Sequence, residues 1–354
     1  MKKEKICFFV HTEYHLLLSI HALLTQYSDS NRYEVEFILK RTTKSPRLKL
    51  DLDFSSLPCK YRFLDFDLKL NALLKAEEKQ KIDEVLQLEF AEFNFFQEQD
   101  PITLIILHHY KKKGTKINLF QDGLKPYIAH SMSFSPTLWV NNIKQNLWIR
   151  KNGYTVSNWF SFINSKMYGF LKEIDQLYLT FPQSYINWNK LPVKTMSLHY
   201  TPDFVAVLKK VFLWDEALLE KRERVIFFMN QPMHDDGTFE VSVLKKLQHN
   251  YPGSTIYIKN HPITTQVKLN AYKTLDNVEI INSKIPAELF ISQLENSIVL
   301  SVCSTSMFIN NPDCKFYYIF AVKEQNNIER LKKYAVINPS EHIITAPNLE
   351  AIEF

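Results

Sequence analysis

The stretch Ser254-Thr255-Ile256-Tyr257-Ile258-Lys259-Asn260-His261-Pro262 predicts a buried strand that ends in polar side chains. Some forty residues later a second strand-like run, Ser297 to Val302, ends in Cys303-Ser304-Thr305-Ser306. Open α/β sheets bind their ligands at the carboxyl ends of the strands. Two polar clusters at the ends of successive strands therefore predict a nucleotide or phosphate site, and favour an enzyme over a structural protein.

The surrounding sequence extends this pattern into a second α/β half. Strands are predicted at 225–229, 278–281 and 316–320, with helices at 239–248 and 286–294. Strands that alternate with helices are typical of a parallel, doubly wound sheet.

The first part of the chain predicts another sheet of the same kind. The apolar runs 6–10, 34–40, 61–64, 102–107, 116–120 and 175–179 are expected strands, and 13–26 and 70–88 are expected helices. Pro182, Pro192 and Pro202 mark a linker near 185–215. The sequence thus predicts an α/β protein with two Rossmann-like doubly wound domains, 1–200 and 201–354, facing a central cleft.

Composition excludes several classes of protein. With only 6 Gly, neither a Walker loop nor a GxGxxG motif is present. The 4 Cys form no CxxC pair, which favours scattered buried thiols in a reducing compartment over a zinc or disulfide framework. No run of eighteen apolar residues occurs, so we expect no transmembrane helix and a cytoplasmic location. A net charge of +5 does not by itself indicate nucleic acid.

The segment 139–172 interleaves basic and aromatic residues and contains no acidic residue before Glu173. That pattern suits an anionic membrane surface, and hence a peripheral position on the inner membrane. The alternative is a pair of amphipathic helices whose aromatic side chains face the core. Aromatic residues make up 14% of the chain, which fits a homodimer interface and fits core filling equally well.

Two clusters in the second half could bind and act on a phosphate. His261 follows a strand, and Pro262 restricts its backbone, so its imidazole is placed to donate a proton or hydrogen bond to a leaving phosphate. Ser304, Thr305 and Ser306 precede an apolar run, and we expect them to cap a helix whose free N–H groups bind a phosphate. A packed turn histidine and a simple serine cap are the alternatives.

Carboxylates follow other predicted strands. Asp122, in Gln121-Asp122-Gly123, could act as a general base, although Asp-Gly also favours a β-turn. Gln231 opens a segment that contains Asp235 and Asp236, which could act in acid/base chemistry or cap the helix near Thr238. Glu288 lies in the first turn of a predicted helix and could hold ribose hydroxyls.

Taken together, these segments resemble bacterial sialyltransferases of the GT-B type. Those enzymes carry an acidic D/E-D/E-G motif, a His-Pro motif and a Ser-Ser/Thr motif, in the order of Gln121-Asp122-Gly123, His261-Pro262 and Ser304-Thr305 here. The opening Thr12-Glu13-Tyr14-His15-Leu16-Leu17-Leu18 resembles the N-terminus of glycosyltransferase family 52, which includes lipooligosaccharide sialyltransferases. The segments at Gln231-Pro232 and Ile285-Pro286-Ala287-Glu288 resemble that family as well.

The resemblance implies an inverting transfer of sialic acid from CMP-sialic acid to a galactose-type hydroxyl of a lipooligosaccharide or capsular glycan. No metal is required, because His and hydroxyl groups can neutralise the single phosphate of CMP. The donor would be bound by Lys259, His261, Pro262, Glu288, Ser304, Thr305, Ser306 and Gln231. On the acceptor side the resemblance implies Thr12, Tyr14 and His15.

The general base is left between two residues. The first acid of the D/E-D/E-G motif is Gln121 here, so only Asp122 remains of it, while the family 52 resemblance favours a base just ahead of His-Pro, at Asp235. We therefore take Asp235, Asp122 and His261 as candidate catalytic residues. The alternatives are a GT-B enzyme that uses CMP-Kdo or a UDP-sugar, and a non-catalytic, membrane-associated partner in polysaccharide assembly.

Overall fold

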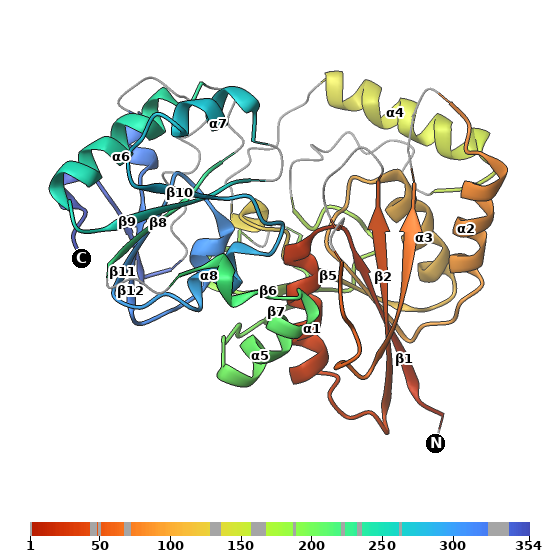
Figure 1. Cartoon of the computed structure of the whole chain (residues 1–354). Helices are drawn as coiled ribbons and strands as arrows, with labels where there is room; N and C mark the ends of the chain where they lie inside the picture. The colour runs from red at the N-terminus through yellow and green to blue at the C-terminus, as the bar shows by residue number, and fades with distance from the viewer. Residues whose placement is uncertain are drawn as a thin grey trace. The chain divides into compact units, whose positions relative to one another are not determined.

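The computed structural model describes residues 2–42, 48, 51–66, 72–127, 136–156, 168–186, 189–220, 224–231, 236–261, 264–324 and 340–354. The chain divides into two compact units, the first formed by 1–49 and 54–197 and the second by 50–53 and 198–354. The sequence placed the domain boundary after residue 200. Both units are parallel-sheet, Rossmann-like α/β domains (Figure 1).

The first unit is built on a seven-stranded sheet in the order β3-β2-β1-β4-β5-β6-β7, and every neighbouring pair is parallel. Its strands are β1 (Glu4–Val10), β2 (Tyr33–Arg41), β3 (Cys59–Asp65), β4 (Glu92–Phe95), β5 (Lys116–Phe120), β6 (Gln176–Leu179) and β7 (Val193–Thr195). Its helices are α1 (Glu13–Thr25), α2 (Ala76–Leu86), α3 (Pro101–Lys112) and α4 (Pro136–Lys151).

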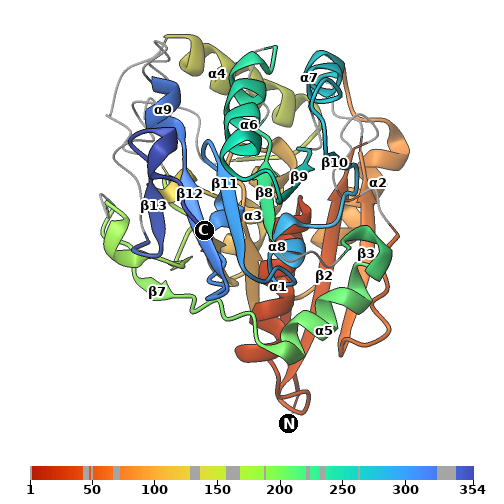
Figure 2. The same cartoon turned by 60° about the vertical axis from the view of Figure 1, so that its left-hand side comes forward.

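The second unit holds a six-stranded parallel sheet in the order β10-β9-β8-β11-β12-β13 (Figure 2). The strands are β8 (Val225–Met229), β9 (Thr255–Lys259), β10 (Val278–Ile281), β11 (Ser297–Ser301), β12 (Cys314–Tyr318) and β13 (Ile343–Thr345). The helices are α5 (Pro202–Val211), α6 (Thr238–Asn250), α7 (Gln266–Tyr272), α8 (Ala287–Ile291) and α9 (Phe320–Glu324).

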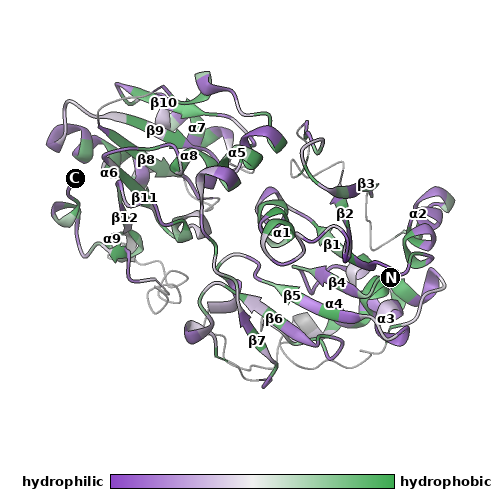
Figure 3. Ribbon diagram, turned by 90° about the horizontal axis from the view of Figure 1, so that it is seen from below, coloured by the Kyte–Doolittle hydropathy of each residue, from purple (hydrophilic) through white to green (hydrophobic). Residues whose placement is uncertain are grey.

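The cores explain why the strands form where they do. β8 reads VIFFM and is buried along its whole length, as expected for a central strand covered on both faces. In Figure 3 the strands of the second sheet are mostly hydrophobic, whereas α6 carries both hydrophobic and hydrophilic residues. In the first unit, aromatic side chains fill the core: Phe8 makes edge-to-face contacts with Phe37 and Phe120, with ring centroids 5.8 and 5.5 Å apart.

One predicted strand is wrong. Residues 102–107 belong to the helix α3, although their side chains are strong strand formers. The Asp100 carboxylate caps this helix by accepting the Thr103 N–H at 2.9 Å, and Pro101 occupies the first turn, where a missing N–H costs nothing. The strand that fills this place in the sheet is β4, which the sequence did not indicate.

Other elements differ in extent. The helix expected over 70–88 is described only over 76–86, and the one expected over 286–294 covers Ala287–Ile291. The predicted linker at 185–215 contains β7 and α5, since Thr201 caps α5 and Pro202 starts it. No helix among the described residues is long and apolar enough to span a lipid bilayer.

The strand order reverses between β1 and β4 in the first unit and between β8 and β11 in the second. At such a switch point the loops on either side diverge and leave a crevice outside the carboxyl ends of the strands. A ligand site is therefore expected at the carboxyl edge beside each of these switch points.

Candidate functional site

The first unit brings together two residues that lie far apart in the sequence. The Nε2 atom of His15, in the first turn of α1, is 3.0 Å from Oδ1 of Asp122, which follows β5. Thr12 places His15, because its hydroxyl caps α1 and accepts the His15 N–H at 3.1 Å. His15 and Asp122 thus meet at the carboxyl edge of the sheet, beside the switch point between β1 and β4.

The surroundings of His15 fix its tautomer. The His11 backbone N–H donates to Nδ1 of His15 at 3.4 Å, so this nitrogen keeps its lone pair and the proton sits on Nε2, facing Asp122. The imidazole is fully buried and stacks on Phe96, with centroids 4.3 Å apart and planes 6° apart. Both ring nitrogens are therefore used in holding the ring and the carboxylate.

Asp122 is the more accessible member of the pair, with 24% of its side chain exposed. Partial burial acts to raise the pKa of its carboxyl, but the hydrogen bond from His15 and the positive charge of Lys125 outweigh burial and hold the pKa below its usual value. The Lys125 ammonium lies 4.0 Å from Oδ2. Asp122 is consequently ionised at neutral pH, with Oδ2 on the side away from His15.

Gln121, where the resembled motif has an acid, is a buried structural residue. Its Nε2 donates to the Tyr14 hydroxyl at 3.1 Å, and its Oε1 accepts from the Thr180 N–H at 2.9 Å and from the Tyr127 hydroxyl. A carboxylate accepts only, whereas a carboxamide also donates. Gln121 and Tyr14 therefore connect the loop after β5 with α1 and support the position of Asp122.

A second set of largely buried polar residues, His11, Asp100 and Lys40, lies near the His15–Asp122 pair. His11 Nε2 is 4.0 Å from Asp100 Oδ2, and Asp100 forms an ion pair with Lys40. Burial and the Lys40 charge lower the pKa of His11 to about 3, so its ring is neutral. The role of His11 was missed from sequence, because His11 lies between β1 and α1, where no periodic pattern indicates which side chains it contacts.

In the second unit, the turn after β9 that carries His261 is tied to the end of β8. The His261 carbonyl accepts hydrogen bonds from the N–H and hydroxyl of Thr264, at 2.9 and 2.8 Å. Asn230, directly after β8, donates its Nδ2 to the Thr264 hydroxyl at 2.9 Å and accepts from Tyr272 at 2.9 Å. His261 is half-buried. Asn230 and Thr264 were missed from sequence.

Lys259, Glu288 and Ser306, three of the predicted donor-binding residues, lie close together. Glu288 is buried, which raises the pKa of its carboxyl, while a hydrogen bond with Ser306 and the charge of Lys259 act in the opposite direction. The Lys259 ammonium donates to the Ser283 carbonyl and lies 5.6 Å from the Phe290 ring centroid. These residues join the end of β9, α8 and the loop after β11.

Ser304 does act as a cap, but of a very short element. Its hydroxyl accepts the Ser306 N–H at 3.3 Å at the start of a 3₁₀ helix, η4 (Thr305–Phe308), not of a longer α-helix. One turn sums few peptide dipoles, so the electrostatic attraction expected for a phosphate is small. The Tyr318 hydroxyl fixes this turn by donating to the Ser304 carbonyl at 2.8 Å.

Two candidate residues, Asp235 and Pro262, lie outside the described residues. Beside them, the Asp236 carboxylate accepts the Thr238 N–H at 2.9 Å. The N-cap residue of α6 is Gly237, however, so the side-chain cap considered for this segment is not formed. The Gln231 carbonyl accepts from Lys268 at 3.3 Å, and Lys268 forms a buried ion pair with Glu240 at 3.1 Å. The backbone at Gln231, directly after the end of β8, is thus tied to α7.

Of the segment 139–172, residues 157–167 fall outside the described ranges. Among the rest, Trp148 and Tyr168 are buried in the core of the first unit, and Trp148 donates to the Ala72 carbonyl at 2.6 Å. α4 nevertheless exposes Val140 and Leu147. No group of three His, Cys, Asp or Glu side chains arranged to hold a metal ion occurs in the described part of the chain.

A comparison with protein families gives one match. The model of the family described as alpha-2,8-polysialyltransferase (POLYST) matches residues 80–314. No curated protein matches the sequence.

Solved structures with the same fold include sialyltransferases. The 2,6-sialyltransferase of Photobacterium sp. JT-ISH-224, solved with CMP and lactose, is 13% identical, with a TM-score of 0.53 over 97% of this chain and 78% of that one. The GT-B domain of the Photobacterium damselae sialyltransferase is 12% identical, with a TM-score of 0.53 over 97% and 100%. UDP-GlcNAc 2-epimerase of Neisseria meningitidis is 11% identical, with a TM-score of 0.53 over 98% and 87%. At these identities the likeness establishes the GT-B-like fold.

Proposed function

Because the chain belongs to the alpha-2,8-polysialyltransferase family and is a glycosyltransferase of the sialyltransferase type, we propose that it transfers sialic acid from CMP-sialic acid with inversion at the anomeric carbon. The observation that carries the mechanism is the His15–Asp122 pair at the carboxyl edge of the first sheet. The acceptor in this proposal is a galactose-type hydroxyl of a lipooligosaccharide or capsular glycan, as the resemblance to family 52 implies.

Asp122 is the proposed general base. It is ionised, and its Oδ2 atom is not taken up by His15, so it can accept the proton of an acceptor hydroxyl. In the transfer step, the hydroxyl oxygen bonds to the anomeric carbon and the proton passes to the carboxylate. The bond from that carbon to the phosphate oxygen breaks, and its electron pair leaves with CMP. His15 is a positioning residue, since both of its nitrogens are engaged.

The second unit is proposed to bind the donor. Lys259, Glu288 and Ser306 lie together, and His261 follows Lys259 on the turn after β9, which is braced by Thr264. In the proposal His261, Ser304 and Thr305 contact the phosphate of CMP, and Glu288 holds the ribose or the base. Gln231 and Pro262 complete the donor site. No metal is assigned a role, because one phosphate is within the neutralising capacity of these groups.

Asp235, the base that the sequence resemblance favours, is the rival base to Asp122, and CMP-Kdo or a UDP-sugar is the rival donor. The complex of CMP and lactose with the Photobacterium 2,6-sialyltransferase supports a CMP donor, because that enzyme shares the fold. Peripheral membrane binding through α4 is also part of the proposal, supported by exposed Val140 and Leu147. A homodimer stays a prediction from the aromatic content.

A thermal shift of the whole chain with CMP, UDP and GDP tests the donor. A ligand that binds only the folded protein stabilises it and so raises Tm. At a ligand concentration a hundred times Kd, the free energy of unfolding increases by about 2.7 kcal/mol. CMP alone should raise Tm, and His261→Ala should reduce that rise while Tm without ligand is unchanged. A rise with UDP or GDP would replace the donor. No rise with any of the three, together with binding to anionic liposomes, would favour the non-catalytic membrane partner.

A further inference from the structure

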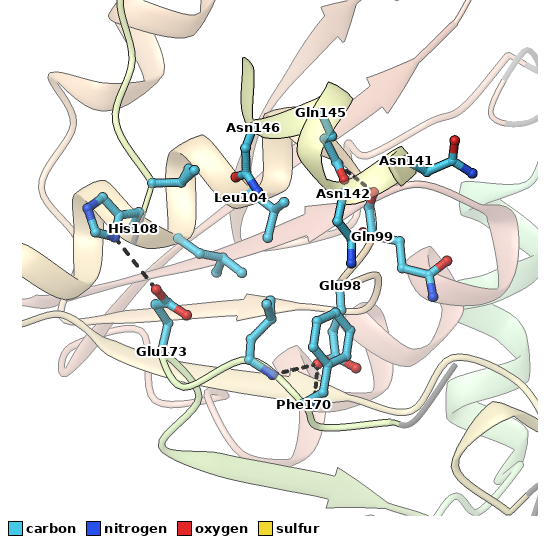
Figure 4. A pocket seen from close by; sticks show the side chains of 13 residues that line it. Glu98, Gln99, Leu104, His108, Asn141, Asn142, Gln145, Asn146, Phe170 and Glu173 are labelled. Atoms are coloured by element: carbon cyan, nitrogen blue, oxygen red, sulfur yellow. Dashed lines mark hydrogen bonds and ion pairs between the residues drawn. The ribbon is translucent and has the colours of Figure 1, made fainter. Parts of the chain in front are cut away.

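The first unit contains a pocket that the proposed reaction does not use. It lies between α3, α4 and the loops after β4 and before β6, and its cavity volume is about 220 Å³ (Figure 4). That volume is below the roughly 300–1,000 Å³ of pockets for drug-sized ligands, so it suits a ligand no larger than a single sugar ring.

One wall is a row of carboxamides on α4. Asn141, Asn142, Gln145 and Asn146 line the pocket, at a spacing that puts them on one side of the helix. The Gln145 Nε2 atom donates to the Gln99 carbonyl across the mouth at 2.9 Å, which fixes that side chain. A carboxamide group has both donors and an acceptor, which matches the hydroxyl group, itself a donor and an acceptor.

The opposite wall is held by a buried acid. The Glu98 carboxyl accepts the N–H groups of Gly169 and Phe170, both at 2.8 Å, and of Leu171 at 3.2 Å. Burial raises its pKa to about 7. Figure 4 shows Glu98 beside the Phe170 ring, and at one end of the pocket His108, whose Nδ1 atom lies 3.6 Å from Oε1 of Glu173.

The remaining surface is apolar. Leu104 and Leu107 of α3, with Phe170 opposite, form an apolar lining next to the carboxamide row. A pyranose ring has the complementary character, since its C–H groups form an apolar face and its hydroxyls form a polar rim. The lining described here contains no Lys or Arg, while it contains Glu98 and Glu173. An anionic sugar or a phosphate would therefore find no Lys or Arg side chain in this lining to pair with.

We propose that this pocket binds an uncharged sugar residue, a hexose or N-acetylhexosamine, through the α4 carboxamides and the Phe170 ring. Assigning that sugar to the acceptor glycan, at a distance from the reacting hydroxyl, rests on the proposed function; the binding itself does not. A nucleoside is the competing ligand class, because its base could also stack on Phe170 and bond to carboxamides.

The test is lactose binding to the whole chain without nucleotide, measured by saturation-transfer NMR and calorimetry beside 3′-sialyllactose and cytidine. Lactose should bind saturably and more tightly than the other two. Asn142→Leu, which removes hydrogen bonds at nearly constant volume, should weaken lactose about tenfold, the effect of losing about 1.4 kcal/mol. Leu104→Trp, which fills the pocket, should abolish binding. Gln80→Leu, an exposed carboxamide on α2, is the matched control.

Asp122→Asn separates this pocket from the proposed reaction site. If lactose binding is lost in Asp122→Asn but kept in Asn142→Leu, the sugar binds at the reaction site and the pocket proposal is overturned. Preferential binding of cytidine, or no saturable lactose binding at all, overturns it as well. If the Tm of Asn142→Leu is lower than that of the unchanged protein, its weaker binding is explained by misfolding. Lactose binding by Leu104→Trp then decides whether the sugar occupies the pocket. If lactose binds but CMP does not raise Tm, the pocket proposal stands and the proposed function is contradicted.

Discussion

At the scale of single residues, the notable feature is a carboxylate whose two oxygens have different neighbours. Oδ1 of Asp122 is bound to His15, whose other nitrogen is held by the His11 backbone, and Oδ2 is 4.0 Å from Lys125. This arrangement keeps the carboxylate ionised and oriented. It also separates the roles of the two residues, because His15 has no nitrogen left for a substrate.

Asp122→Asn should lower kcat by about 10²–10⁴-fold, the usual contribution of general base catalysis, and leave the Tm rise with CMP unchanged. The amide keeps the shape and can still contact His15, so the fold should persist. Steady-state kinetics of Asp122→Asn and Asp235→Asn should be measured together. Full activity in the first and loss in the second would assign the base to Asp235 instead.

His15→Gln should move the acid limb of the kcat/KM profile to higher pH. The folded pKa of Asp122 is depressed, so the carboxylate is present above that value and is lost as pH falls through it. Removing the His15 hydrogen bond raises the pKa, and the ionised base is lost at a higher pH. The profile should be recorded from pH 4 to 8.

Lys125→Met should shift the same limb in the same direction through charge alone, and His199→Gln, at an exposed site, is the control. A lower rate in His15→Gln with an unmoved acid limb would mean that the ring acts only in packing against Phe96.

The sequence could predict that the site residues follow strands, but it could not predict which of them contact each other. That His15 and Asp122 each follow a strand is readable from the sequence, whereas their contact across 107 positions depends on the strand order β1-β4-β5. Asn230 and Thr264 hold the backbone of the turn after β9 through hydrogen bonds. These bonds depend on the geometry of that turn, which the local sequence does not specify.

At the scale of elements, the helix cap decides whether residues 102–107 form a strand or a helix, which their hydrophobicity alone does not. Residues 102–107 have the composition of a strand, and a short apolar run of this kind fits a buried helix equally well. Asp100 and Pro101 favour the helix, and a capping reading of these two residues could have predicted α3. β13, by contrast, is three residues long and has no sequence signal of its own.

The Lys268–Glu240 ion pair between α7 and α6 should behave as a coupled unit. The two side chains are 1% and 0% exposed, so either one alone leaves an uncompensated buried charge. Lys268→Met and Glu240→Gln should each cost about 3–5 kcal/mol in urea unfolding, and the double variant clearly less than their sum. Additive costs would mean that the two charges are stabilised by other groups.

At the scale of the whole molecule, the two Rossmann-like units have different proposed roles. The first carries the general base, and the second carries the donor-binding residues. Each unit has its own switch point, and the predicted residues fall at both. The sequence could predict this doubled fold because each half repeats the alternation of strand and helix. It could not predict that residues 50–53 join the second unit, because no local pattern marks them.

Hydrogen exchange with and without CMP should locate the donor. Protection should appear in the loops after β8, β9 and β11 of the second unit, because ligand binding reduces local opening. The edge of β1 and β5 in the first unit should exchange as before. UDP at the same concentration is the control. Protection confined to the first unit would reverse the assignment of donor and acceptor sides.

The excursion of residues 50–53 has a consequence for synthesis on the ribosome. The Asp53 N–H donates at 3.0 Å to the carbonyl of Val211, at the end of α5, a residue translated more than a hundred positions later. The sheet of the first unit is complete once β7 has emerged, and it can form while the second unit is still being made. The Asp53 N–H gains this acceptor only after α5 has been made, so the hydrogen bond forms when translation is already well into the second unit.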